Sequence, residues 1–151
     1  MLQLITTYGF DGLDIDLEGA SFALQAGDFD FRNPTTPRVV HFISGLQQLL
    51  AQLPPDFILS AAPEVAMVQG GMSTYSGVWG SYLPLLHAFR ARFDWVHVQH
   101  YNAGTMYGRD GQIYTPGTVD FHVAMADALI GGFSLQNGIT FDPFEPQQVA
   151  I

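Results

Sequence analysis

The sequence of 151 residues contains neither cysteine nor lysine, and all five of its basic residues are arginine. Without cysteine the chain can form no disulfide, no thiolate zinc site and no cysteine nucleophile. Its net charge of −9 leaves no basic surface of the kind that binds nucleic acid or an anionic membrane. A neutral polymer remains a compatible ligand, because an acidic cleft does not repel it.

Long hydrophobic runs are also missing. No run approaches the roughly 18 apolar residues of a membrane-spanning helix. The first ten residues have no basic n-region, so we expect no signal peptide in this chain. Hydrophobic residues make up 48% and charged residues 13% of the sequence, which argues against disorder. We expect residues 1–151 to form one domain with a sizeable core and no internal linker.

Strands and helices are expected to alternate along the chain. The pattern of apolar residues predicts strands at about residues 11–18, 57–62, 95–102 and 148–151. Helical spacing predicts helices at about residues 37–53, 82–92 and 119–130. Thr36 and Pro37 are the expected N-cap and first-turn residues of the first of these helices. Strand, loop and helix repeat in this order, as in a parallel α/β sheet.

The predicted architecture is an incomplete (β/α)8 TIM barrel. Polar and aromatic residues gather after the expected strand ends, where the active sites of such barrels lie. A closed barrel needs eight strands and typically about 250 residues, whereas this chain supplies about four strands. The competing architecture, an open doubly wound sheet, usually carries a GxGxxG phosphate-binding loop, which the sequence does not contain.

The stretch YGFDGLDIDLEGA at residues 8–20 holds four of the chain's 14 acidic residues. In a strand, successive side chains point to opposite faces. One face then carries Asp14, Asp16 and Glu18, and the other carries Leu13, Ile15 and Leu17. Close carboxylates in an enclosed site cannot all ionise cheaply, so at least one keeps its proton near neutral pH. Glu18, at the end of the strand, is placed to hold that proton as a general acid, as in glycosidic bond cleavage.

Two other interpretations of this acidic strand are weaker. A solvated edge strand would expose its carboxylates, but it does not require a continuous Leu-Ile-Leu stripe on the other face. A metal site is disfavoured because the acidic spacing, at positions 11, 14, 16 and 18, differs from that of an EF-hand loop. We therefore expect neither a metal ion nor a cofactor.

The acidic stretch resembles the signature of family 18 glycoside hydrolases, the chitinases and their relatives. DGLDIDLE at residues 11–18 matches the DGxDxDxE strand motif of that family. SAAPE at 60–64, VQHYN at 98–102 and QVAI at the C-terminus resemble later strands of the same family, in the same order. The resemblance implies that residues 1–151 are a partial catalytic domain, truncated at both ends, from about barrel strand 4 to the start of strand 7.

The resemblance also implies roles for individual residues. Glu18 matches the general acid/base, Asp16 matches the aspartate that holds the 2-acetamido group of the substrate, and Asp14 matches the aspartate that shares its proton. Tyr101 matches the tyrosine that donates a hydrogen bond to the acetamido group. Gln99 and Asn102 are expected sugar contacts. Glu64 fits either a substrate-binding place in the cleft or a loop-capping role.

Strand alternation supports this assignment independently. Gln99 and Tyr101 share one face of their expected strand, as they must if both point into one cleft. The same alternation places His97 inward and His100 outward, so a metal shared by the two is disfavoured. We expect both histidines to be structural.

The resemblance implies a chitinase that hydrolyses β-1,4 bonds between N-acetylglucosamine units by a retaining, substrate-assisted mechanism. Two alternatives stay open: an endo-β-N-acetylglucosaminidase acting on N-glycans, and a non-hydrolytic carbohydrate-binding member of the same fold. The expected partner is chitin or its oligosaccharides, and the full-length protein is expected to be extracellular and monomeric. The 151-residue chain by itself is expected to be inactive, because an open half-barrel exposes sheet edges.

Overall fold

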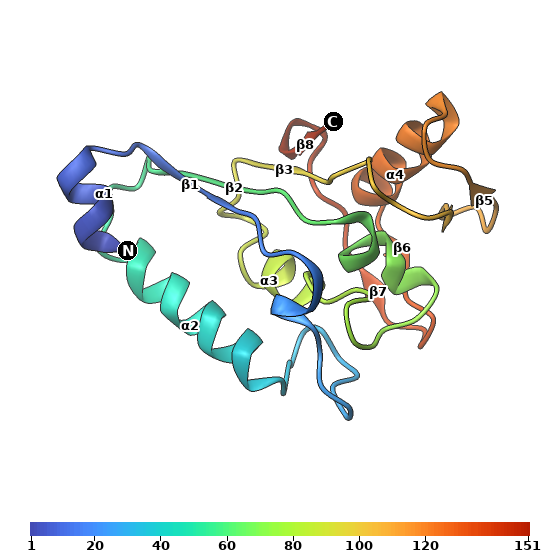
Figure 1. Cartoon of the computed structure of the whole chain (residues 1–151), viewed down its shortest axis with the longest axis horizontal. Coiled ribbons are helices and arrows are strands. Elements are labelled where there is room, and N and C mark those ends of the chain that lie inside the picture. The colour runs from blue at the N-terminus through green and yellow to red at the C-terminus, as the bar shows by residue number, and fades with distance from the viewer.

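A computed structural model describes all residues of the chain, 1–151, and shows a parallel sheet flanked by helices (Figure 1). Four strands form this sheet: β1 (Gly12–Ile15), β2 (Ile58–Ala61), β3 (Trp95–His97) and β8 (Val149–Ala150). Their order is β1-β2-β3-β8, and every neighbouring pair is parallel. The prediction of a parallel α/β sheet is confirmed. The four strands do not close into a barrel, since β1 and β8 lie at the two edges of the sheet.

The chain forms four α-helices: α1 (Leu2–Tyr8), α2 (Pro37–Leu50), α3 (Leu83–Ala88) and α4 (Val119–Gly131). The last three lie close to the predicted positions. Four short 3-10 helices join them: η1 (Gly19–Phe22), η2 (Val65–Met67), η3 (Gln69–Met72) and η4 (Pro146–Gln148). None of the helices combines the length and the apolar character that crossing a membrane requires. α2 and α3 end earlier than the apolar spacing predicted.

The predicted strands are too long. β1 stops at Ile15 rather than at Glu18, and β3 stops at His97 rather than at Asn102. The pairing of β1 with β2 does not continue to Glu18. Glu18 is instead the N-cap residue of η1, into which the chain turns. Beyond β3, Asn102 adopts a left-handed conformation with φ of 52°, which asparagine tolerates better than most residues. The carboxylates and Gln99 therefore lie largely on extensions of the strands.

Two antiparallel hairpins were not predicted: β4 (Met106–Tyr107) with β5 (Ile113–Tyr114), and β6 (Phe133–Ser134) with β7 (Thr140–Phe141). Each strand has two residues, which is too short for an alternation of apolar and polar residues to be recognised. The first hairpin lies between the strand predicted at 95–102 and the helix predicted at 119–130.

The helix starts are stabilised differently from the prediction. Thr36 is the residue before α2, as predicted, but its side chain makes no capping hydrogen bond. Instead its hydroxyl donates to Asp28 Oδ2 at 2.6 Å, and Asp28 is itself buried. Thr118 does cap α4, since its Oγ1 accepts from Phe121 N at 3.2 Å.

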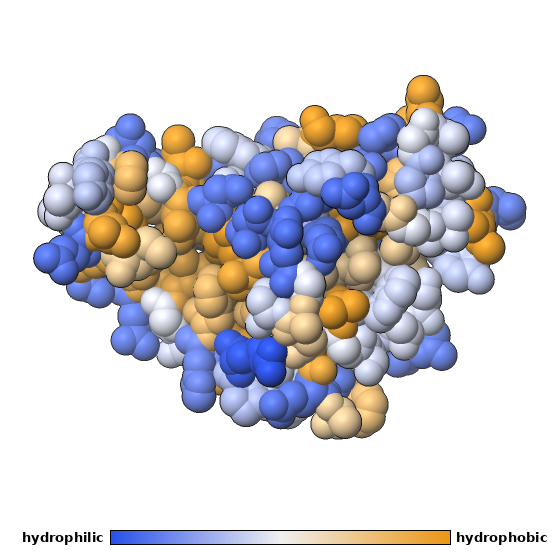
Figure 2. Space-filling model, viewed as in Figure 1, coloured by the Kyte–Doolittle hydropathy of each residue, from blue (hydrophilic) through white to orange (hydrophobic).

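One hydrophobic core of 30 buried residues joins the sheet to α3 and α4. Ile15 is buried within it, and Leu13 and Leu17 pack against it, which confirms that the aliphatic side of the acidic stretch faces apolar neighbours. An apolar groove of about 480 Å³ remains between β1 and α2, and its lining includes Phe42 and Leu46. Figure 2 shows hydrophobic residues exposed on this part of the surface.

Candidate active site

A cleft of about 400 Å³ lies where β1 and β3 end. Its lining combines acidic, amide, imidazole and aromatic side chains: Asp14, Asp16, His97, Gln99, His100, Tyr101 and His122, with Ala62, Val98 and Ile151. The C-terminal ends of parallel strands meet at the same edge of a sheet. Residues from the acidic stretch and from VQHYN, about 80 positions apart in sequence, are therefore brought together.

Asp14 contacts side chains from two other strands of the sheet, β2 and β3. Its Oδ1 accepts a hydrogen bond of 2.6 Å from Ser60 Oγ on β2, with which it is also in register. The same Oδ1 lies 3.2 Å from His97 Nε2 on β3. Asp14 is therefore fixed from one side of the cleft, although its side chain is 44% exposed.

Gln99 connects the other two acidic side chains. Its amide nitrogen lies 3.0 Å from Asp16 Oδ1 and 3.0 Å from Glu18 Oε1. It is also 2.8 Å from the carbonyl oxygen of Ala62. An amide NH2 has two hydrogens, so two of these three acceptors are satisfied at any time. Because Gln99 is only 8% exposed, its donors are committed to these neighbours rather than to water.

The carboxylates are close enough to alter one another's ionisation. Partial desolvation, followed by the charges of Glu18 and Asp14, raises the pKa of Asp16 above its ordinary value. A hydrogen bond with Glu18 raises it further, whereas donation from Gln99 lowers it. The raised pKa of Asp16 was not predicted, because it arises from partial desolvation and from the nearby charges of Glu18 and Asp14 in the folded chain.

Tyr101 and Asn102 leave the sheet beyond Gln99. Tyr101 lines the cleft with its side chain 63% exposed, so its hydroxyl is available to a ligand. Asn102 is also exposed, and it does not line the cleft. Its left-handed backbone conformation turns the chain away from β3.

Glu64 also lies outside the cleft lining. Its Oε2 accepts a hydrogen bond of 3.0 Å from Gly19 N, at the start of η1. Its backbone pairs with that of Gln99 in an isolated parallel bridge. Of the two roles that the sequence left open, this geometry fits the loop-capping role, since Glu64 fixes the backbone directly after Glu18.

Tyr82, which the sequence analysis did not identify, contacts the backbone of the acidic stretch. Its hydroxyl accepts from Leu17 N at 2.5 Å and lies 3.4 Å from the carbonyl oxygen of Ile15. Burial raises the pKa of Tyr82, so the phenol stays protonated. Its partners lie more than 60 positions away in the sequence, so no local sequence pattern predicts these contacts.

The two histidines of VHVQHYN contact different groups, although both line the cleft. His97 contacts Asp14 in the cleft. His100 is buried against α4, with its Nδ1 3.1 Å from His122 Nδ1 and its ring edge-on to Phe121. No group of three or more histidine, aspartate or glutamate side chains in the chain has the geometry to hold a metal ion.

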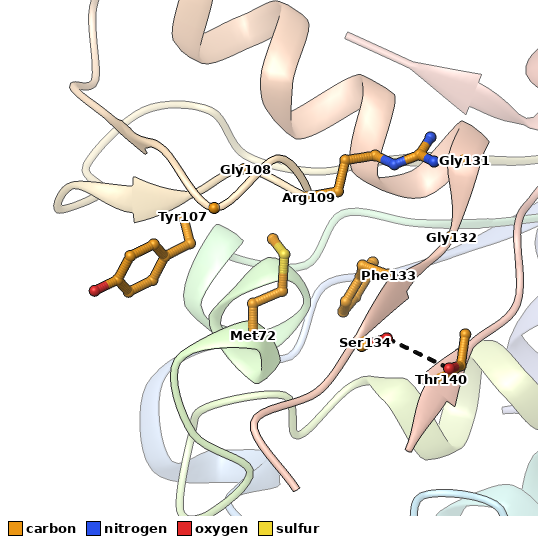
Figure 3. A pocket seen from close by; sticks show the side chains of 10 residues that line it. Met72, Tyr107, Gly108, Arg109, Gly131, Gly132, Phe133, Ser134 and Thr140 are labelled. Atoms are coloured by element: carbon orange, nitrogen blue, oxygen red, sulfur yellow. Dashed lines mark hydrogen bonds between the residues drawn. The ribbon is translucent and has the colours of Figure 1, made fainter. Parts of the chain in front are cut away.

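A second hollow, of about 470 Å³, lies between the β4–β5 hairpin, the end of α4 and the β6–β7 hairpin (Figure 3). Glycines 108, 111, 131 and 132 form much of its lining, and Ser134 and Thr140 contribute hydroxyls 3.4 Å apart. It contains no carboxylate or imidazole to transfer a proton. The cleft at the ends of β1 and β3 is therefore the candidate active site.

Known proteins resemble the chain over nearly its whole length. It is 54% identical over 151 residues to Chitinase D of Niallia circulans, covering 99% of this chain and 29% of that protein. It is 44% identical to Exochitinase 1 of Streptomyces olivaceoviridis, covering 99% of this chain and 27% of that protein. No protein-family model matches the chain.

The solved structures that resemble the chain include chitinases, as the sequence relatives do. A family GH18 chitinase from Chromobacterium violaceum is 37% identical with a TM-score of 0.86, and the match covers 98% of this chain and 38% of that one. The Legionella pneumophila ChiA C-terminal domain is 28% identical with a TM-score of 0.81, covering 97% and 44%. The chain spans less than half of the length of each of these proteins. The resemblance seen in the sequence is confirmed: along its whole length the chain is related to a segment of the chitinases of glycoside hydrolase family 18.

Proposed function

We propose that the protein containing this chain is a chitinase, which hydrolyses the β-1,4 bonds between N-acetylglucosamine units. The observation that carries the proposal is the cluster of three carboxylates at the cleft. Asp14 and Asp16 line the cleft, and the Gln99 amide nitrogen lies 3.0 Å from both Asp16 and Glu18. The named chitinases among its relatives support the same activity. The net charge of −9 is compatible with a neutral polysaccharide and not with a polyanion.

In the proposed mechanism the substrate supplies the nucleophile. The acetamido oxygen of the sugar attacks the anomeric carbon while Glu18 protonates the departing glycosidic oxygen. Glu18 then removes a proton from the water that opens the oxazolinium intermediate, so the anomeric configuration is retained. Asp16 holds and orients the acetamido group, and the raised pKa of Asp16 supports its carrying a proton in this role. Asp14 shares that proton.

Four further residues contribute to substrate binding in this proposal. Tyr101 donates a hydrogen bond to the acetamido group, which its exposed position in the cleft supports. Gln99 contacts the sugar and also holds Asp16 and Glu18. Asn102 contacts the sugar from the turn after β3. Glu64 is proposed to border the substrate site. Its hydrogen bond with Gly19 N also fixes the loop after Glu18.

We further propose that residues 1–151 form part of a (β/α)8 barrel, from about strand 4 to the start of strand 7. The all-parallel order β1-β2-β3-β8, with helices between the strands, supports this arrangement. The two open sheet edges would then pair with the remaining barrel strands. The complete protein is proposed to be a monomeric, extracellular enzyme that binds chitin and needs no cofactor.

Product analysis tests this function. The complete catalytic domain is incubated with N-acetylglucosamine oligomers and, separately, with an N-glycopeptide. We expect cleavage of the oligomers into shorter oligomers, with the β-configuration at the new reducing end. Cleavage of the glycopeptide alone would replace the proposal with an endo-β-N-acetylglucosaminidase. Binding without cleavage of either substrate would indicate a carbohydrate-binding protein.

The variant Glu18→Gln tests the acid/base assignment. We expect kcat to fall by at least about 100-fold, because general acid–base catalysis contributes roughly 10²–10⁴-fold. Oligosaccharide binding should stay measurable by calorimetry, since the amide keeps the size of the side chain. Asp56→Asn, at an exposed carboxylate away from the cleft, is the matched control and should keep full activity. A Glu18→Gln enzyme with near-normal turnover would contradict the assignment.

A further inference from the structure

His97 has no role in the function proposed above, yet its ring contacts one of the three acidic residues. Its Nε2 lies 3.2 Å from Asp14 Oδ1, across the gap between β3 and β1. The contact joins two strands that are not neighbours, because β2 lies between them in the sheet. Ser60 of β2 fills the intervening position and donates to the same oxygen at 2.6 Å.

The direction of these hydrogen bonds indicates where the charge lies. A carboxylate oxygen that accepts from two donors is favoured in its ionised form. Asp14 Oδ1 receives Ser60 Oγ and has His97 Nε2 in reach, whereas Asp16 Oδ1 receives only a share of the Gln99 amide. The donors are therefore unequal: Ser60 Oγ and His97 Nε2 are both in reach of Asp14 Oδ1, whereas Asp16 Oδ1 shares the Gln99 amide with Glu18 and with the carbonyl oxygen of Ala62.

We propose that His97 is a positioning residue that donates from Nε2 to Asp14 and thereby keeps the shared proton on Asp16, next to Glu18 and the substrate. This inference rests on the proposed chitinase function. The inference concerns which of Asp14 and Asp16 holds their shared proton before substrate binds. When Asp16 carries the proton towards the acetamido group, Asp14 remains as an anion that keeps its two donors.

The surroundings of His97 contain few other charges. The ionisable side chains that line its cleft are Asp14 and Asp16 from the acidic stretch, His100 and Tyr101 from its own segment, and His122 from α4. β2 and β8, which flank β3, contribute no ionisable side chain. Of the carboxylates in the cleft, Asp14 is the one within hydrogen-bonding distance of the ring. No arginine lines the cleft, so no stronger cation competes with His97 for Asp14.

Kinetics of the complete catalytic domain on N-acetylglucosamine oligomers test the proposal. His97→Leu removes the donor, and we expect kcat to fall about tenfold, as for loss of one hydrogen bond to a charged group. KM should change by less than about twofold, because substrate binding is not the step affected. The acidic limb of the kcat profile should move to higher pH, because Asp14 loses a donor that favours its anion. His97→Gln, which keeps an amide donor at similar reach, should restore most of the rate.

Coupling to Asp14 separates this role from a purely structural one. In an Asp14→Asn background, His97→Leu should have less than about a twofold effect, since neighbouring residues that act together are not additive. Additive losses, or an unshifted pH profile, would overturn the proposal. His41→Leu, at an exposed histidine on α2 outside the cleft, is the matched control and should leave kcat unchanged.

A spectroscopic measurement keeps the proposal testable without activity. The ring ¹⁵N signals of His97 should show Nε2 carrying a hydrogen near pH 7, with a shift on Asp14→Asn. An Nε2 without hydrogen would overturn the inference even in an active enzyme. An inactive wild type with the expected ¹⁵N signals would refute the proposed chitinase function and leave the His97–Asp14 interaction established.

Discussion

The two sides of β3 and its extension differ in what holds their side chains. On one side, His97 contacts Asp14 of β1 at 3.2 Å, and Gln99 contacts Asp16 and Glu18, beyond the end of β1, at 3.0 Å. On the other side, Val96, Val98 and His100 are buried against the core and α4. In the segment 96–100, residues that contact the acidic side chains thus alternate with residues that pack into the core.

This difference separates chemistry from stability. Side chains on the cleft side contact groups that are proposed to react or to carry protons, while contributing little buried apolar surface. Those on the core side are buried and form no hydrogen bond with Asp16 or Glu18, although Val98 and His100 border the cleft. Substitutions on the cleft side should therefore change turnover more than the free energy of unfolding, and substitutions on the core side should do the reverse. Both expectations are tested in the complete catalytic domain.

Gln99→Met should give the largest effect on the cleft side. Methionine keeps the length of the side chain but removes the amide that Asp16 and Glu18 share. We expect kcat to fall by about 10- to 100-fold, since hydrogen bonds to charged groups contribute about 1.5–3 kcal/mol each. The free energy of unfolding, measured in urea, should change by less than about 1 kcal/mol, because a buried polar side chain is replaced by an apolar one.

A conservative variant sharpens this test. Gln99→Glu keeps the shape but replaces the amide donor with a third carboxyl group beside Asp16 and Glu18, so kcat should fall at least as far as in Gln99→Met. Turnover in Gln99→Met within twofold of the wild type would contradict the cleft role of Gln99.

Val96→Ala should show the opposite behaviour. Val96 is fully buried between β2 and β8 in the sheet. Removing two methylene equivalents from the core should lower the free energy of unfolding by about 2 kcal/mol, the sum of lost transfer energy and a small cavity. The kcat of the folded fraction should stay within about twofold of the wild type, because no cleft contact is lost. A large loss of kcat without loss of stability would contradict the division between the two sides.

The sequence predicted the sheet and the composition of the cleft, because both depend on local alternation. Asp14 and Asp16, like His97 and Gln99, keep the two-residue period of an extended chain, and the structure brings these four side chains together. The ends of β1 and β3 could not be predicted in this way. An extended chain keeps its alternation after its ladder hydrogen bonds stop, so the side-chain pattern does not mark where pairing ends.

Contacts between distant residues were beyond prediction for a different reason. Tyr82 holds Leu17 N through its hydroxyl, and Ser60 holds Asp14, yet neither residue stands in a pattern that differs from an ordinary buried position. Which buried hydroxyl meets which backbone or carboxylate group depends on how the elements pack. The raised pKa of Asp16 is a further example, since it depends on partial desolvation and on the positions of Glu18 and Asp14 in the folded chain.

The last of the expected effects concerns His100, a buried residue of the same segment. Burial, and then the charge of His122, lowers the pKa of His100 from 6.5 to about 4. Between these values the unfolded chain binds a proton that the folded protein excludes. Stability from this residue is therefore complete above pH 6.5 and is lost as the pH falls towards 4. The slope is at most about 1.4 kcal/mol per pH unit.

Urea unfolding at several pH values between 4 and 7 measures this slope. His100→Gln removes the titrating group, and the loss of stability on acidification should become smaller than in the wild type by up to that slope. His122→Gln removes only the second cause of the lowered pKa, so its effect on the slope should be weaker than that of His100→Gln. Equal slopes in all three proteins would show that His100 is not kept neutral by the core side of β3. The acid sensitivity would then have to arise from the carboxylates on the cleft side.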